Sequence, residues 1–426
     1  MIKHILKQIW NKRRANTWIF LELVLVTFFM WGVIDPVYVL LSNRAIPSGY
    51  DIDNVFRLTV GQYPSTHRKY QEEMNSDSMR TANFLHMYEL VRNYPGVESA
   101  VVTSNEQYPL SGSTSTTGIQ YDSIQANALI MSFYHDGDFF KVFRIHDINT
   151  GNIPDHRNPV DRTVYLTKSI ERKLLPDGNL VGKDIFPSHT KDTVYFTVKG
   201  IVPDFKFRST EQPQRTQFIP MDKLTIEQFP WSAQICFRIR EGLSKEVFAE
   251  QFKQEMTSRL NVGNLYMLKL SDFEAIYRHS EFSQGVTNKL RLQISLATFF
   301  LVCTFLGIAG TFWLRSDSRK GEIGLRMALG STRGNILKEF LIESWLITTA
   351  AWLLGILFVL QRVYLTGFAE RPQFENEAYM QNLFIPHFLI VSLIVYILMM
   401  LITVVGTLIP ARQAAKTLPS DALRNE

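Results

Sequence analysis

Four long runs of apolar residues constrain this chain more than any other feature of its sequence. Each run is long enough to cross a lipid bilayer, for which a helix needs about 20 apolar residues. The runs occupy residues 17–41, 291–314, 340–362 and 384–409. We therefore predict four transmembrane α-helices, and we expect the long stretch between the first two, residues 42–290, to fold outside the membrane.

The charges beside the runs predict how the chain is oriented. The N-terminal segment 1–16 holds five basic and no acidic side chains, and the loop 315–339 holds six basic and three acidic ones. The tail 410–426 adds three basic residues, whereas the loop 363–383 is acidic. Because basic flanks stay on the cytoplasmic side, we predict that both termini and the loop 315–339 are cytoplasmic, with 42–290 and 363–383 on the other side.

The first run, residues 17–41, is predicted to be an uncleaved anchor. It is longer than the apolar part of a signal peptide, and no small-residue cleavage pattern follows it. Glu22 lies inside this run, and an acid inside a membrane is a functional candidate by default. A carboxylate that snorkels or pairs near the cytoplasmic face is the favoured interpretation. Further along, the dipeptide Asp35-Pro36 predicts a kink near the outer end.

The loop 315–339 has two different sides if residues 320–329 form a helix. The polar side consists of Arg319, Glu322 and Arg326, and the opposite, small-residue side of Gly321, Gly324 and Ala328. A glycine inside a helix costs about 1 kcal/mol relative to alanine, so the glycines indicate that another surface comes close. Gly330 is placed to end this helix, and Ser331 or Thr332 to cap the next. A solvated basic flank is the alternative, but the two sides favour a docking element.

The region 42–290 is predicted to be an α+β domain. The pattern strand–helix–strand occurs twice, first as 55–60, 80–93 and 97–103, and again as 233–240, 244–260 and 265–270. Two such units can pair into one split, ferredoxin-like sheet.

A β-rich subdomain, about 119–225, is predicted to be inserted between the two units. Its expected elements are strands 163–166, 194–202 and 217–219 and a short helix 169–175. The Ser/Thr/Gly-rich segment 111–118 is expected to be a flexible connection. From residue 272 we expect one helix to leave the domain as a stalk and to continue into the second run.

The sequence contains no recognisable active site. It has no GxxxxGK[ST] nucleotide motif, no HExxH metal motif and no GxSxG nucleophile motif. Cys236 and Cys303 are predicted to be small buried hydrophobes rather than a disulfide or metal ligands. The net charge of +5 is no evidence for nucleic acid binding, because the basic residues cluster beside the apolar runs. We therefore expect no enzyme activity and no catalytic, cofactor or metal site in this chain.

The runs themselves offer no polar pathway, since no span carries a line of charged residues. This argues against an ion channel. Two small-xxx-small pairs, Gly307 with Thr311 and Ala351 with Gly355, predict places where helices pack closely.

Several segments together resemble the FtsX-like and MacB-like ABC transporter permeases. The loop sequence RKGEIGLRMALGSTR, residues 319–333, is similar to their signature, as are residues 340–343 and the ending 410–424. The outer region is similar to a MacB-like periplasmic core in four further segments, 138–143, 165–170, 180–183 and 197–205. The resemblance covers most of the chain. Two departures are Met327, where a basic residue is common, and the lack of a fused ATPase domain in this sequence.

The resemblance implies a homodimeric or heterodimeric permease in a bacterial inner membrane, with residues 42–290 in the periplasm. Two copies of a separate ATPase would bind ATP and Mg and would press on helix 319–330 as a coupling helix. The stalks would carry the motion outward, a mode called mechanotransmission, for export or extraction of an envelope substrate. The expected ATPase-coupling residues are Arg319, Glu322, Gly324, Arg326, Gly330 and Glu343.

Other classes of function remain open at this point. An FtsX-like regulatory scaffold would activate a cell-wall hydrolase through its outer domain, although the size of 42–290 favours the MacB-like form. An anchored sensor fits the first two spans but not the last two. A periplasmic adaptor or an outer-membrane partner is compatible with the sequence, and the residues do not identify the cargo.

Overall fold

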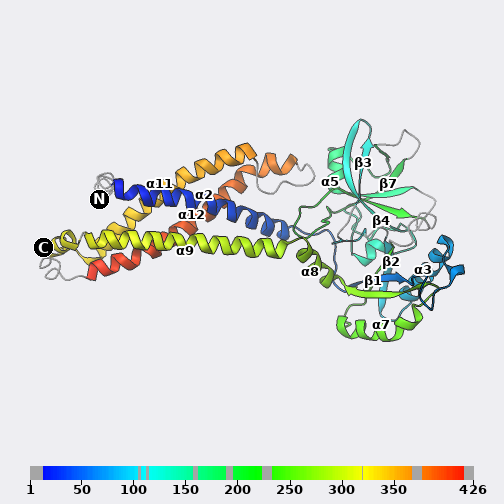
Figure 1. Ribbon diagram of the computed structural model, residues 1–426. Coiled ribbons are helices and arrows are strands. Elements are labelled where there is room, and N and C mark those ends of the chain that lie inside the picture. Colours follow the sequence, from blue (N-terminus) through cyan, green and yellow to red (C-terminus); the bar gives the residue numbers. More distant parts are fainter. Residues whose placement is uncertain are drawn as a thin grey trace. The chain divides into compact units, whose positions relative to one another are not determined.

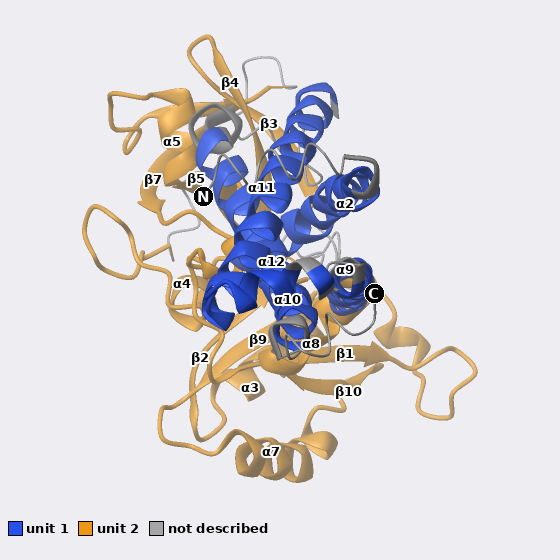
Figure 2. Ribbon diagram, turned by 90° about the vertical axis from the view of Figure 1, so that its left-hand side faces the viewer, with its two compact units in different colours: residues 1–41, 287–426 blue, residues 42–286 orange. Residues whose placement is uncertain are grey.

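The chain folds into two compact units, which Figure 2 colours separately. The computed structural model describes residues 13–103, 107–111, 115–156, 162–188, 195–222, 233–318, 320–366 and 377–416. One unit contains residues 1–41 and 287–426, and the other contains residues 42–286.

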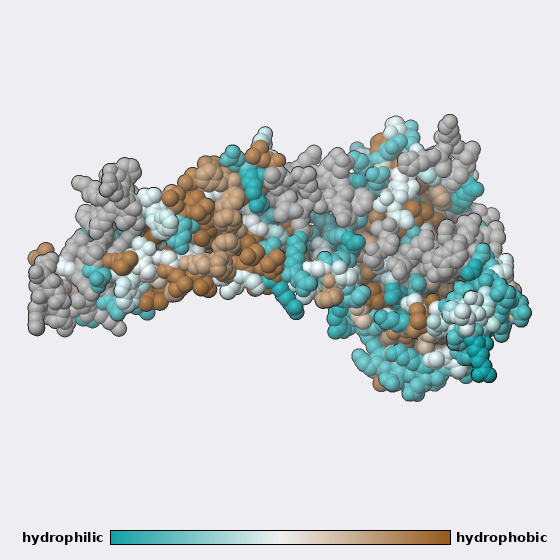
Figure 3. Space-filling view, in the orientation of Figure 1, coloured by the Kyte–Doolittle hydropathy of each residue, from teal (hydrophilic) through white to brown (hydrophobic). Residues whose placement is uncertain are grey.

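The first unit is helical, and its helices contain the four predicted spans (Figure 1). These helices are α2 (Arg13–Ala45), α9 (Val286–Ser318), α10 (Lys320–Ala328), α11 (Arg333–Thr366) and α12 (Glu377–Lys416). All but α10 are long and apolar enough to cross a membrane. Figure 3 shows hydrophobic residues gathered on the surface of this unit, as expected for helices that face lipid.

Close helix packing occurs at both predicted small-residue pairs. A Cβ added to Gly355 in α11 would lie 2.8 Å from the Cβ of Thr27 in α2 and 3.2 Å from the carbonyl oxygen of Val24. A Cβ added to Gly307 in α9 would collide with the carboxylate of Glu22. The prediction of close approach at these glycines is confirmed, and Glu22 proves to be a half-buried side chain that lies against α9.

Replacing Gly355 by leucine is expected to destabilise the helical unit by about 3 kcal/mol, because the larger side chain must displace the backbone of α2. Thermal unfolding of the purified chain in detergent would measure the loss. Gly310→Leu in α9 is the matched control, since a Cβ there meets nothing within 4 Å. Equal unfolding temperatures for the two variants would contradict this account.

The second unit contains the two predicted strand–helix–strand patterns. The first consists of β1 (Val55–Gln62), α3 (Asp77–Arg92) and β2 (Val97–Thr103), and the second of β9 (Gln234–Ile239), α7 (Lys245–Arg259) and β10 (Leu265–Asp272). Their strands lie in the order β10-β1-β9-β2, and each neighbouring pair is antiparallel. Side chains from both helices and from the strands form one buried core. Both helices begin at serine N-caps, Ser76 and Ser244.

The β-rich region between the two patterns forms a closed ring of strands. Its elements are β3 (Ser115–Tyr121), β4 (Ile124–Tyr134), α4 (Phe139–Val142), β5 (Thr163–Thr167), α5 (Lys168–Leu174), β6 (Asp184–Pro187), β7 (Phe196–Val202) and β8 (Thr216–Met221). The strand order is β4-β3-β6-β7-β5-β8, and β8 pairs again with β4. One pairing, Thr103 with Phe133, joins this ring to β2. Two shorter segments, the 3-10 helix η1 (Glu72–Met74) and α8 (Phe273–Ser283), also belong to the described part of this unit.

Three expectations from the sequence are wrong. Cys303 is exposed rather than buried, whereas Cys236 is buried as predicted. Residues 115–118 are not a flexible connection but the start of β3, where pairing along the whole of β4 overrides the loop-like composition; residues 112–114 lie outside the described part. The expected continuous stalk is interrupted between α8 and α9. Gly285 has a φ of +69°, a left-handed conformation that ends a helix, and α9 starts immediately after it.

Candidate functional site

The loop between the second and third spans forms a helical corner, as its sequence predicts. Helix α10 ends at Ala328, and Gly330 follows with a φ of +98°. The amides of Gly330 and Ser331 donate to the carbonyls of Met327 and Arg326, the two hydrogen bonds of a Schellman motif. The Thr332 hydroxyl then accepts a hydrogen bond from the amide of Asn335 and caps α11. Both helix ends are therefore fixed by local chemistry.

The two sides of α10 differ from the simple division into polar and small residues. Ile323 and Gly324 are buried within the helical unit, and Met327 packs against the same core. The opposite side is apolar and exposed, with 53% of Leu325 and 80% of Leu329 accessible. Gly324 is therefore covered by this chain itself, and the exposed apolar ridge is made by Leu325 and Leu329. The division of α10 into a polar and a small-residue side misses these two leucines, although their i, i+4 spacing indicates an apolar side.

Arg326 holds the corner together. Its Nη1 lies 2.9 Å and 3.2 Å from the two carboxylate oxygens of Glu339 in α11. Both side chains are partly buried, so the ion pair is less screened by water than one on an open surface. The pair joins α10 to α11 across the Gly330 turn, which makes the corner a stiff element rather than a loose loop.

The other expected coupling residues do not all reach this surface. Gly330 is exposed at the turn, whereas Glu343 is buried in α11. Arg319 lies outside the described residues, and Glu322 is described only through the backbone of α10. The structure thus brings Arg326 and Gly330 to the exposed corner, and it places Gly324 and Glu343 in the interior.

A second notable cluster surrounds the end of α2 at the base of the outer unit. The buried Lys206 ammonium donates to the carbonyls of Asn43 and Ile46, the latter at 2.8 Å, and it also contacts that of Ser209. Carbonyls at a helix C-terminus lack partners inside the helix, so Lys206 caps α2 from a distant loop. Burial lowers the pKa of this ammonium. Beside it, Glu281 of α8 accepts hydrogen bonds from Arg44 and Ser209.

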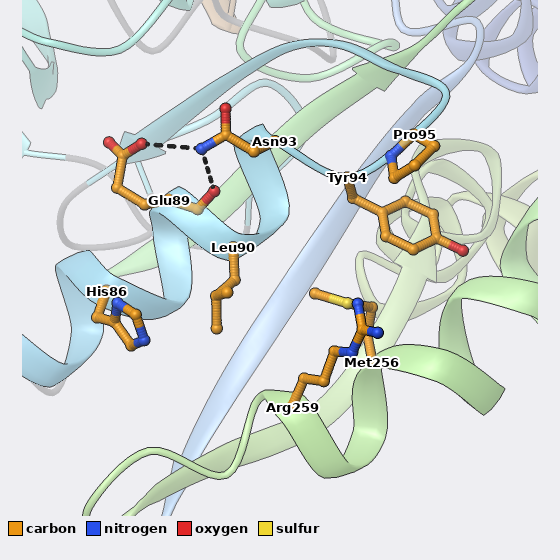
Figure 4. Close-up of a pocket in the computed structure, with 8 residues that line it drawn as sticks. All are labelled: His86, Glu89, Leu90, Asn93, Tyr94, Pro95, Met256 and Arg259. Atoms are coloured by element: carbon orange, nitrogen blue, oxygen red, sulfur yellow. Dashed lines mark hydrogen bonds between the residues drawn. The ribbon is translucent and has the colours of Figure 1, made fainter.

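The outer unit also contains a groove of about 350 Å³ between α3 and α7 (Figure 4). Its lining consists of His86, Glu89, Leu90, Asn93, Tyr94, Pro95, Met256 and Arg259. The amide of Asn93 donates to the backbone and side chain of Glu89, at 2.9 and 3.3 Å. The groove combines apolar Leu90 and Met256 with polar and charged side chains. No short sequence motif could have revealed it, because its two sides lie far apart in the chain.

Comparisons with known proteins agree with the resemblance seen in the sequence. The family model "MacB-like periplasmic core domain" matches residues 37–255, and "FtsX-like permease C-terminal" matches residues 294–419. A macrolide export ATP-binding/permease protein MacB of Neisseria meningitidis is 24% identical over 263 residues, which are 61% of this chain and 40% of that protein. MacB 1 of Yersinia pestis is 24% identical over 301 residues, 68% of this chain and 42% of that protein.

The chain spans about two fifths of the length of these curated relatives. Among solved structures, the periplasmic region of MacB from Actinobacillus actinomycetemcomitans is similar over 55% of this chain and 94% of that one, with 13% identity and a TM-score of 0.34. The extracellular domain of the noncanonic ABC-type transporter YknZ from Gram-positive bacteria is similar over 51% of this chain and 100% of that one, with 11% identity and a TM-score of 0.30.

Proposed function

The chain belongs to the ABC transporter permeases that have a MacB-like periplasmic core domain and an FtsX-like C-terminal region, and on that premise we propose that it transmits the ATP-driven movements of a separate ATPase to its outer domain. The observation that carries the proposal is the corner formed by α10 and α11. An apolar ridge there is exposed to solvent, on an element that an ion pair and two caps make stiff. Such a ridge is suited to fit a groove in a partner protein.

The partner is an ABC ATPase, in two copies, which binds ATP and Mg; this chain contributes no catalytic residue. A second permease copy or a paralogue completes the complex. Helix α9 supports the presence of a second permease subunit, because only 11% of its most apolar stretch is buried in the described chain, against 44% for α2. Lipid covers the part of the exposed apolar surface of α9 that a second copy does not cover.

The orientation follows from the charges beside the spans. Both termini and the α10–α11 corner are in the cytoplasm of a bacterial cell, and the outer unit is in the periplasm. Within that unit, the order β10-β1-β9-β2 with α3 and α7 supports a split ferredoxin-like subdomain into which the ring of β3 to β8 is inserted.

In this mechanism the work is done outside the inner membrane. ATP binding draws the two ATPases together, they push on α10, and α2 and α9 move the outer unit. The cap that Lys206 places on α2 supports this route, because it holds the last turn of α2, which belongs to the outer unit. The movement exports or extracts an envelope substrate, with or without an adaptor or outer-membrane partner.

A mild-detergent pull-down of the tagged chain from its native membranes, followed by mass spectrometry, tests the proposal. We expect a P-loop ATPase at a ratio near one to one. Leu329→Asp is expected to reduce its recovery at least about tenfold, because burying a charge in place of a leucine removes about 2 kcal/mol of apolar contact and adds a desolvation cost.

Leu268→Asp is the control, because Leu268 is also exposed but lies on β10 of the outer unit. If the intact chain is recovered without any ATPase, the transmission proposal is wrong, and a scaffold that regulates an envelope enzyme becomes the better account. If Leu329→Asp recovers the parental amount of ATPase, the ridge is not the docking surface.

A further inference from the structure

A buried acid and a buried imidazole join two spanning helices of the first unit. The Nε2 of His387 in α12 lies 2.8 Å from Oδ1 of Asp35 in α2, and the side chains are 2% and 0% exposed. The other carboxylate oxygen of Asp35 has no hydrogen-bond partner among the described residues. Replacing such a pair by apolar residues often leaves stability unchanged or improved. An ionisable pair inside a membrane bundle is therefore better explained by function than by stability.

Each member of the pair stands next to a proline inside its own helix. Pro36 follows Asp35 in α2, and Pro386 precedes His387 in α12. A proline removes one backbone hydrogen bond from the helix interior, and it makes that point the place where the helix bends. The Asp35–His387 contact thus ties α2 and α12 together where each helix bends most easily. The ring of Tyr38 packs on His387 at 5.0 Å and shields the contact.

Helix α11 contributes a cation to the same place. The Arg362 guanidinium lies 5.8 Å from the ring centre of Trp31, and its Nη1 lies 3.4 Å from the position of a Cβ at Gly32. Gly32 is the residue whose carbonyl loses its helical donor to Pro36, four residues further on. Three helices therefore supply charged or polar groups around Pro36 of α2.

Helix α2 is one of the two helices, with α9, through which the chain passes between the two units. It runs without interruption from Arg13 to Ala45, and its last turn, from Ser42, already belongs to the outer unit. A change in bend at Pro36 therefore changes the direction in which α2 enters that unit.

We propose that Asp35 and His387 are positioning residues that couple bending of α2 at Pro36 to bending of α12 at Pro386. Movement of α11 and α12 then passes to the outer unit through α2. This inference rests on the proposed function, since it names the place inside the membrane where the transmitted motion changes helices. The pair acts as a joint: it holds the two proline sites together while the segments on either side change direction.

The test follows the position of the outer unit relative to the bundle. The full chain, with the ATPase that co-purifies with it, is placed in lipid nanodiscs and spin-labelled at Leu268→Cys and Leu365→Cys, two exposed positions in the two units. Cys303→Ser removes the exposed native thiol, and burial raises the pKa of the Cys236 thiol to about 12, which leaves it unreactive. Distances between the labels are measured with and without ATP, beside the rate of ATP hydrolysis.

We expect Asp35→Asn and His387→Phe to reduce the ATP-induced shift in distances about tenfold, the bias that one charged hydrogen bond gives to a two-state equilibrium. ATP hydrolysis should stay at the parental rate. The exchanged pair, Asp35→His with His387→Asp, should restore most of the shift. Ser392→Ala is the matched control, because the Ser392 hydroxyl accepts a hydrogen bond from Trp31 and also joins α2 to α12, but neither residue is next to a proline in the chain; it should respond like the parent.

The outcomes separate the two proposals. A parent complex that hydrolyses ATP without any change in distance overturns the transmission proposal and the joint with it. If the parent complex does respond to ATP, two results would overturn the joint alone. Either the single variants respond as strongly as the parent, or Ser392→Ala loses as much of the distance change as they do. Failure of the exchanged pair to restore any response, in a protein that still unfolds at the parental temperature, also overturns the joint.

Discussion

Arg326→Glu is expected to reduce co-purification of the ATPase about tenfold and to abolish ATP-dependent movement of the outer unit. In the structure Arg326 bonds both oxygens of Glu339. A glutamate at position 326 replaces an attraction by a repulsion at the same distance, a change of about 1 to 2 kcal/mol for a partly buried pair. Helix α10 would lose its attachment to α11, and the ridge of Leu325 and Leu329 would lose its fixed direction.

The exchanged variant, Arg326→Glu with Glu339→Arg, separates two roles for this arginine. It restores the ion pair within the chain but reverses the charge that a partner would meet at each position. We expect it to recover most of the ATPase, because the ion pair seen in the structure is internal. Recovery of the unfolding temperature without recovery of the ATPase would instead assign Arg326 a direct contact with the partner. Normal movement in the single variant would refute the role of the corner altogether.

The spanning helices and the corner could be predicted because their signals are local. Apolar length alone located the four spans, and the glycine at position 330 located the end of α10. The small residues were harder to interpret, because a glycine shows that something comes close but not what comes close. Gly324 turned out to be buried in its own unit, and the exposed ridge came instead from Leu325 and Leu329.

The contacts that depend on distant residues could not be predicted. In the sequence Asp35 is only part of a kink signal, and nothing there relates it to His387. Lys206 appears as one more basic residue until the fold brings it to the end of α2. In the sequence of β9, Ile235, Phe237 and Ile239 alternate with other residues, a pattern that indicates one buried face. It does not show that the other face is buried too, because that depends on the helix α4, which contacts β9.

The buried face that alternation missed carries the residue whose loss should be most damaging to the outer unit. Arg238 in β9 is only 1% exposed, and burial lowers the pKa of its guanidinium. Its nitrogens donate to the carbonyls of Val142, Asp51 and Asp53 at 2.7, 2.7 and 2.6 Å, and one lies 3.4 Å from the Asp51 carboxylate. These bonds tie β9 to the segment that precedes β1 and to the end of α4.

Arg238→Met is therefore expected to destabilise the outer unit by about 3 to 5 kcal/mol, because it removes the buried guanidinium that donates to the carbonyls of Val142, Asp51 and Asp53. Arg238→Lys should recover little, since an ammonium cannot reproduce the planar fork of a guanidinium. The free energy of unfolding, measured by the fluorescence of the full chain in denaturant, gives the comparison. Arg278→Met is the control: Arg278 is largely exposed, its ion pair with Glu274 is one helical turn away in α8, and its loss should change stability by less than about 0.5 kcal/mol. If Arg238→Met is as stable as Arg278→Met, the guanidinium does not hold these segments together, and the apolar core alone would have to align β9 with β1.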